Sequence, residues 1–156
     1  MSTNEPPSED LQADSHGVQI SRSAERCFEL FCTVERTPEW LPGCRRARVR
    51  HYDGGGLPLV ADYMAGAARG GYLYAMHYEH DPAALAVSWE SEDPTGTRKV
   101  KGSARFLATG PGSCRLLYET RVELSDRLPA WARAAQLDHP AAEICEKFKA
   151  WVEREP

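Results

Sequence analysis

Residues 98–124 read RKVKGSARFLATGPGSCRLLYETRVEL, and this stretch decides the fold class. On both sides of the turn Gly110-Pro111-Gly112, apolar and polar side chains alternate with the period of two that is typical of a β-strand. One face is built from apolar and small residues, and the other carries lysine, arginine and glutamate. The stretch therefore predicts two antiparallel strands that bury one face of a sheet and expose the other.

The same alternation continues upstream, where clusters of Gly, Pro and Asp interrupt it. Five turns separate six predicted strands, which are 44–52, 59–65, 72–80, 84–91, 98–108 and 114–124. No stretch between these strands is long enough for a crossover helix, so the pattern favours an antiparallel meander. Residues His16–Ile20 alternate weakly and predict a short first strand.

Two short helices are predicted between the first two strands. Ser23 is a suitable N-cap, and apolar residues follow it at helical spacing. Thr37 provides a second cap, followed by Pro38 at a position that tolerates proline, and Pro42-Gly43 ends the turn.

The end of the chain predicts a long C-terminal helix. From residue 128 to Glu153, apolar residues recur at three- and four-residue steps, which is typical of an amphipathic helix. Pro140 interrupts the pattern, because proline removes one backbone hydrogen bond. We expect either a bend near Pro140 or a new helix that Asp138 caps.

The composition fits one domain without a nucleic-acid partner. The chain has 156 residues and a formal net charge of −4. Residues 1–15 carry acidic side chains but no lysine or arginine, so we expect a disordered acidic tail there and a single domain over residues 16–156. The remaining charges balance, which argues against nucleic acid because phosphate binding requires a concentrated basic surface.

Neither a cofactor nor a metal is expected. The five cysteines form no CxxC pair and follow no secretory signal, which favours free thiols in a cytoplasmic protein. His77 and His80 would point to opposite faces of one strand and could not bind the same metal. The glycine clusters match hairpin turns rather than phosphate-binding loops.

The predicted inner face of the sheet combines aromatic rings with small side chains. A packed core of this size would use more Leu, Ile and Val, and rings beside small residues leave concave space. The aromatics either fill the core or line a mainly apolar cavity for a small molecule. The residues expected to line this cavity are Trp40, Tyr63, Tyr72, Tyr74, Met76, Tyr78, Trp89, Phe106, Tyr118 and Trp131.

Several motifs carry a family resemblance. They are SAERCF at Ser23–Phe28, VERTPEWLPG at Val34–Gly43, the strand Ala84–Trp89, Gly102–Phe106, and FKAWVE at Phe148–Glu153. These motifs, and the order of elements over about residues 16–154, resemble the START-like superfamily (SRPBCC, helix-grip). The similarity is to its polyketide cyclase/dehydrase and coenzyme Q-binding START-domain group.

The resemblance implies an α+β helix-grip fold. In this fold a curved seven-stranded antiparallel sheet wraps around a long C-terminal helix, with two short helices between strands 1 and 2. A deep hydrophobic cavity lies under the C-terminal helix in such proteins. The family includes lipid and quinone carriers as well as aromatase/cyclases, so the fold alone implies no single activity.

The leading functional prediction is binding of a hydrophobic or aromatic small molecule, such as a polyketide, lipid or quinone. The alternative is a polyketide cyclase or aromatase-dehydratase that catalyses aldol cyclisation or dehydration with inward-facing tyrosines. A third possibility is an interaction module with a vestigial pocket. Catalytic residues stay unassigned, although Asp62 would be a buried acid if its strand turned it inward, with Tyr63 then facing away.

The basic residues concentrate at Arg45, Arg46, Arg48 and Arg50. The last three share one face of a predicted strand, which is either a solvated outer face or a docking surface. A docking surface would suit an acyl carrier protein or an anionic membrane. The sequence leaves open whether the protein is a monomer or a homodimer.

Overall fold

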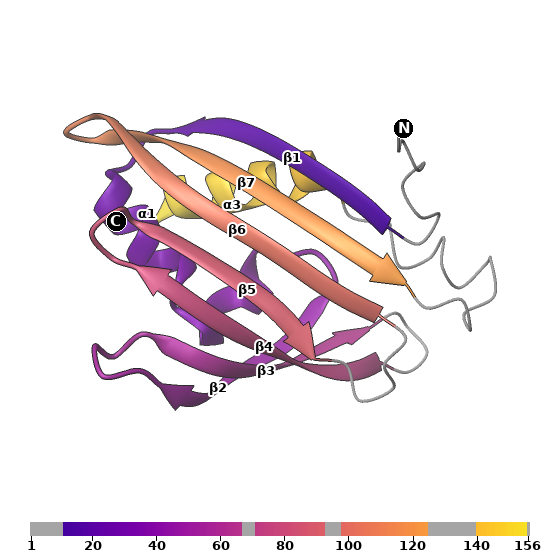
Figure 1. Cartoon of the computed structure of the whole chain (residues 1–156). Helices are drawn as coiled ribbons and strands as arrows, with labels where there is room; N and C mark the ends of the chain where they lie inside the picture. The colour runs from indigo at the N-terminus through magenta and orange to yellow at the C-terminus, as the bar shows by residue number, and fades with distance from the viewer. Residues whose placement is uncertain (1–10, 67–70, 93–97, 125–139, 156) are drawn as a thin grey trace, which may run out of the picture.

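A curved antiparallel sheet of seven strands encloses the helices (Figure 1). The computed structural model describes residues 11–66, 71–92, 98–124 and 140–155. The strands are β1 (Leu11–Ile20), β2 (Cys44–Tyr52), β3 (Pro58–Gly66), β4 (Gly71–Asp81), β5 (Ala86–Glu92), β6 (Arg98–Gly110) and β7 (Ser113–Leu124). The helices are α1 (Ala24–Phe31), the 3₁₀ helix η1 (Val34–Glu39) and α3 (Ala141–Arg154).

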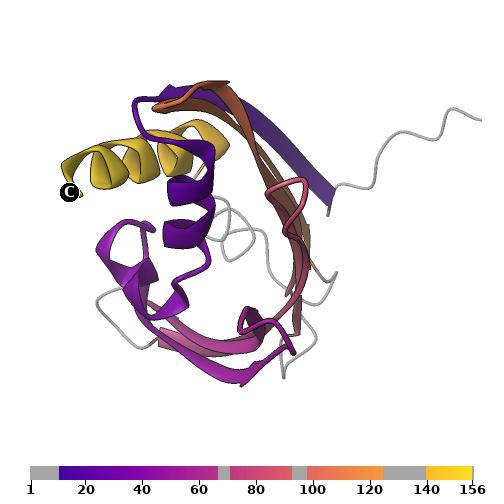
Figure 2. The same ribbon diagram turned by 90° about the vertical axis from the view of Figure 1, so that its left-hand side faces the viewer.

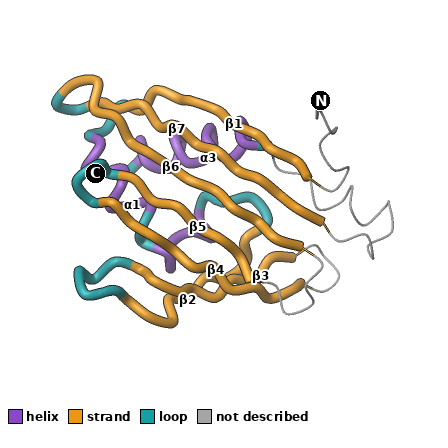
Figure 3. Tube along the Cα trace, in the orientation of Figure 1, coloured by secondary structure: helices purple, strands orange, loops and turns teal. Residues whose placement is uncertain are grey.

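The strand order is β1-β7-β6-β5-β4-β3-β2, and all neighbouring strands are antiparallel (Figure 3). Strands β2 to β7 therefore form the predicted meander, while β1 pairs with the last strand. Figure 2 shows the sheet as an arc, with α1 and α3 at its open side. The α+β helix-grip fold is confirmed.

The first strand is longer than predicted. It begins at Leu11, opposite Glu123 of β7, and not at His16. The prediction of a disordered tail is therefore wrong for residues 11–15, and residues 1–10 lie outside the described part of the chain. Residues 11–15 show no alternation of apolar and polar side chains. They can still form a strand, because β1 is an edge strand that pairs with β7 through backbone hydrogen bonds.

The helices between β1 and β2 differ in kind. Ser23 caps α1 as predicted, since its Oγ accepts a hydrogen bond from the Arg26 amide at 3.1 Å. The second helix is a 3₁₀ helix that begins at Val34, so the predicted start at Thr37 is wrong. Thr37 is buried inside η1 and does not cap a helix.

The C-terminal helix α3 is amphipathic and has 14 residues. It begins directly after Pro140, where we expected a break, and the rest of the predicted helical pattern lies outside the described residues. Pro140 offers no capping side chain, but Asp14 of β1 accepts a hydrogen bond from the Ala141 amide at 2.7 Å. Neither α1 nor α3 has the length and hydrophobicity needed to cross a lipid bilayer.

A cluster of aromatic rings joins the helices to the sheet. Phe148 of α3 is fully buried, and its ring lies 5.5 Å from Phe31, 4.9 Å from Trp40 and 6.0 Å from Phe106, measured between ring centroids. Trp151 also contacts this cluster. Because the rings come from α1, the segment after η1, β6 and α3, the cluster holds all these elements together.

Candidate ligand-binding site

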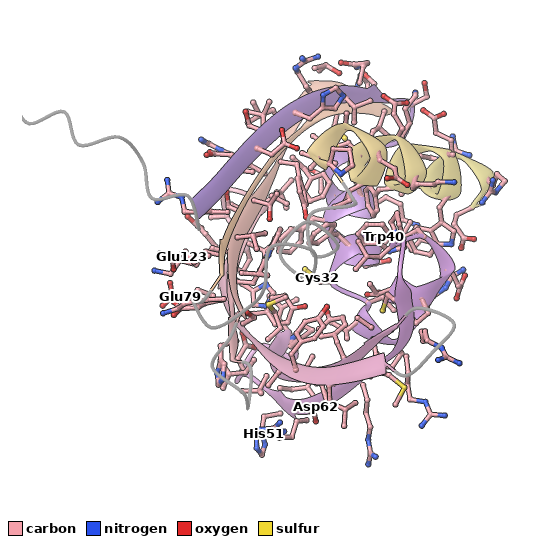
Figure 4. All side chains as sticks on the ribbon, turned by 90° about the vertical axis from the view of Figure 1, so that its right-hand side faces the viewer. Cys32, Trp40, His51, Asp62, Glu79 and Glu123 are labelled. Atoms are coloured by element: carbon pink, nitrogen blue, oxygen red, sulfur yellow. The ribbon has the colours of Figure 1, made fainter. Side chains whose placement is uncertain are left out.

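Strands β3 and β4 direct tyrosines into the interior. Tyr63 is only 4% exposed, whereas Leu73 on the outer face of β4 is 59% exposed. Asp62 points outward (Figure 4) and forms an ion pair with Arg50 of β2, which holds the pKa of the Asp62 carboxyl below its usual value. The interpretation of Asp62 as a buried acid is therefore wrong.

Two of the inward tyrosines share a hydrogen bond. The hydroxyls of Tyr63 and Tyr78 contact each other, and the Tyr63 ring stacks on Tyr74 with 5.4 Å between centroids and 11° between planes. Desolvation by burial raises the pKa of both Tyr63 and Tyr78 well above the usual value. Both hydroxyls stay protonated near neutral pH, so they act as hydrogen-bond donors rather than as bases.

The surface of these tyrosines indicates a hollow interior. Tyr78 lies deep enough for desolvation to dominate its pKa, yet it and Tyr74 are only half-buried and remain accessible to solvent. A side chain on the inner face of a sheet is surrounded by protein. It can keep solvent-accessible surface only if an unfilled space lies next to it. The inward-facing Phe31 and Leu85 are half-buried in the same way.

An open depression of about 460 Å³ lies over the middle of β1, β6 and β7. Its described lining consists of Asp14, Ser15, Lys101, Gly102, Ser103, Glu119, Thr120 and Arg121. Lys101, Glu119 and Arg121 are exposed and alternate with the inward-facing residues of β6 and β7, so this lining lies mostly on the outer face of the sheet. The depression is therefore distinct from the predicted cavity on the inner face.

The Trp40 indole is a buried donor without an acceptor. Trp40 is 7% exposed, and within the described part of the chain its Nε1 has no hydrogen-bond partner. A buried polar group left unsatisfied costs about 1–3 kcal/mol. The indole packs against Phe31, Phe148 and Trp151, so this donor lies within the aromatic cluster.

The fold also brings Cys32 and His80 together. Cys32 Sγ lies 3.8 Å from His80 Nδ1, and His80 Nε2 lies 2.6 Å from the carbonyl oxygen of Pro58. The sequence analysis considered His80 only as a metal ligand together with His77, which points to the opposite face. The inward direction of His80 could have been found, because it lies two residues after Tyr78 on the same strand face, but its partner is 48 positions away in the sequence.

The other predicted lining residues fall into three groups. Trp40 and Phe106 belong to the packed aromatic cluster around Phe148. Met76, Trp89 and Tyr118 lie on the inner face with little exposed surface. The side chain of Tyr72 and all of Trp131 lie outside what the structure describes.

The basic residues lie on β2, an edge strand of the sheet. Arg46 and Arg48 are exposed on its outer face, as expected, and Arg50 shares that face with its partner Asp62. Binding of an acyl carrier protein or a membrane at this surface stays a prediction. Among the described side chains, no three His, Cys, Asp or Glu residues converge as a metal site would require.

A family model matches most of the chain. The model, described as "Polyketide cyclase / dehydrase and lipid transport", matches residues 20–149. The chain belongs to this family. The match runs from the end of β1 into α3, so it includes the inward tyrosines, Cys32 and His80. No curated protein sequence matches the chain.

Solved structures share the fold of this family member. A START superfamily protein from Mycobacterium smegmatis is 16% identical with a TM-score of 0.74, covering 91% of this chain and 97% of that one. The Zhui aromatase/cyclase from Streptomyces sp. R1128 is 16% identical with a TM-score of 0.64, covering 92% and 86%. A truncated norcoclaurine synthase from Thalictrum flavum is 12% identical with a TM-score of 0.65, covering 94% and 96%. At these identities the likeness concerns the fold.

Proposed function

We propose that this protein binds a hydrophobic or aromatic small molecule, of the polyketide, lipid or quinone type, between the sheet and the C-terminal helix. The observation that carries the proposal is the accessible surface of Tyr74 and Tyr78 inside the arc of the sheet. Apolar walls with a few polar groups are typical of small-molecule sites. The family description, which includes lipid transport, agrees with this function.

The donors on the inner wall restrict the chemistry of the ligand. The hydroxyls of Tyr63 and Tyr78 are protonated. A ligand that offers a carbonyl or phenol oxygen would satisfy these donors, whereas a plain hydrocarbon would leave them unpaired. We therefore infer an apolar ligand that carries at least one acceptor oxygen.

Replacing Tyr74 by arginine is expected to weaken ligand binding by about tenfold or more, because a charged group would enter the apolar site. Leu73→Arg is the matched control, since the neighbouring side chain points outward and is 59% exposed. Native mass spectrometry of freshly purified protein would identify retained ligands, and titration with the apolar probe 1-naphthol would give affinities. Equal affinities for the two variants, or no binding by the unmodified protein, would contradict the proposal.

A polyketide cyclase or dehydratase is the second candidate, and the Tyr63–Tyr78 hydroxyl pair favours it. A protonated phenol can donate a hydrogen bond to the oxygen that becomes negative during aldol cyclisation. Tyr78→Phe is expected to lower the rate of cyclisation of a short poly-β-ketone thioester by about 100-fold. Tyr52→Phe, which alters an exposed tyrosine, should leave the rate unchanged. A pure carrier would show ligand binding without product in every variant.

A further inference from the structure

The Cys32–His80 contact has a defined direction. The Pro58 carbonyl oxygen can only accept a hydrogen bond, so His80 Nε2 must carry the proton that joins them at 2.6 Å. In the neutral imidazole this leaves Nδ1 as an acceptor, and Nδ1 is the atom that faces Cys32 Sγ at 3.8 Å. The thiol is thus placed beside a base whose other nitrogen is held by a third group, which is the arrangement of an activated nucleophile.

Ring contacts hold the imidazole in this orientation. Tyr78 stacks on His80 with 5.9 Å between centroids and 20° between planes. Phe28 of α1 meets the same ring edge-on at 6.3 Å. The histidine therefore lies between the sheet and α1, and α1 places Cys32 at its C-terminal end.

The thiol shares the interior with the tyrosine hydroxyls. In Figure 4 Cys32 lies near the centre of the space that the sheet and helices enclose. Cys32 contacts His80, whose ring stacks on Tyr78, so the thiol lies beside the tyrosine pair. Burial, with a smaller contribution from the Asp53 carboxylate, raises the pKa of Cys32 itself to about 12. The thiol therefore stays protonated until a base removes its proton during a reaction.

We propose that Cys32, with His80 as its base, is a site of covalent capture for ligands that contain an α,β-unsaturated carbonyl group. The inference rests on the proposed ligand-binding function, because the electrophile must first occupy the apolar interior. The tyrosine pair supplies the remaining component, a hydrogen-bond donor for the carbonyl oxygen of the ligand.

The reaction is an addition that needs no oxidant and releases no leaving group. The Cys32 sulfur forms a bond to the β-carbon of the ligand while His80 Nδ1 takes the thiol proton. The electron pair of the carbon–carbon double bond moves to the carbonyl oxygen as an enolate, which the Tyr63 or Tyr78 hydroxyl stabilises. The imidazolium then returns the proton to the α-carbon. The product is a thioether, and the imidazole is neutral again.

The other cysteines lack this arrangement. Cys27, Cys114 and Cys145 are fully buried, and Cys27 and Cys114 contact each other with 3.6 Å between their sulfurs. Cys44 is half-buried, and its thiol faces the Arg46 carbonyl oxygen rather than an imidazole. Cys44 is therefore the competitor that an experiment must control.

The test uses two ligands of nearly the same shape. Benzylideneacetone is an aromatic enone that can add to a thiol, and benzylacetone is its saturated counterpart. Intact-mass and peptide mass spectrometry would follow adduct formation in the unmodified protein and in the variants Cys32→Ser, Cys44→Ser and His80→Gln. The glutamine amide can still donate to the Pro58 oxygen but cannot accept the thiol proton.

We expect an adduct at Cys32 that is lost in Cys32→Ser, persists in Cys44→Ser, and forms at least about tenfold more slowly in His80→Gln. Thermal unfolding of each variant would verify that it is folded. Binding of benzylacetone without any adduct of the enone at Cys32 would overturn this inference alone, as would an unchanged rate in His80→Gln. Failure of benzylacetone to bind would overturn the proposed function and this inference with it.

Discussion

Replacing Phe148 by alanine is expected to lower the free energy of unfolding by about 3–5 kcal/mol. The Phe148 side chain is fully buried, and its ring contacts Phe31, Trp40, Phe106 and Trp151. Truncation would remove the ring and leave a cavity that rigid aromatic neighbours cannot fill. The loss would be large because this one side chain joins α3 to α1 and β6.

Urea denaturation followed by circular dichroism would measure this change. Leu107→Ala is the control, because Leu107 lies on the outer face of β6 and is 37% exposed. The control variant should stay within about 0.5 kcal/mol of the unmodified protein. A loss below about 1 kcal/mol for Phe148→Ala would mean that the aromatic cluster does not hold α3 on the sheet.

The aromatic residues thus divide into two groups with different roles. The rings around Phe148 form a packed core, as the core-filling interpretation of the sequence expected. Tyr74 and Tyr78 of β4 keep accessible surface, and whether they line a ligand cavity stays a prediction. Sequence alternation could not separate the two groups, because it predicts only which face of a strand a side chain lies on.

The sheet could be predicted closely from the sequence. The alternating pattern predicted β2 at the residues where the structure has it, Cys44–Tyr52, because each strand has one buried and one exposed face. The start of β1 could not be predicted in this way. Its Asp14 is explained by the Ala141 amide that it caps, a contact between residues 127 positions apart.

The sequence predicted which aromatic side chains face the candidate site, but not the polar contacts within it. The inward direction of Tyr63 and Tyr78 follows from strand alternation, but their mutual hydrogen bond depends on the curvature of the sheet. The pairing of Cys32 with His80 depends on how α1 packs against the sheet, and a sequence contains no local signal for such a contact. The sequence pattern therefore predicted which residues face the interior, whereas the contacts between their polar groups arise only from tertiary packing.

Replacing Gly102 by alanine is expected to destabilise the protein by about 1–3 kcal/mol, although the change adds one methyl group. Gly102 of β6 is paired with Trp89 of β5, and a Cβ atom at Gly102 would lie 2.5 Å from three atoms of the indole. The indole cannot move aside easily, because Phe31 and Tyr118 flank it with centroid distances of 5.6 and 5.7 Å. Overpacking should therefore strain the inner face of the sheet.

Gly54→Ala is the matched control, since a Cβ atom there would meet no atom within 4 Å, and it should cost no stability. Urea denaturation would measure both variants, and near-ultraviolet circular dichroism would report the displaced indole. Trp89→Leu should cost less in the Gly102→Ala background than alone, because the shorter side chain removes the clash. Equal stability of Gly102→Ala and Gly54→Ala would contradict this prediction. It would mean that the Trp89 indole can move away from the added methyl group despite its contacts with Phe31 and Tyr118.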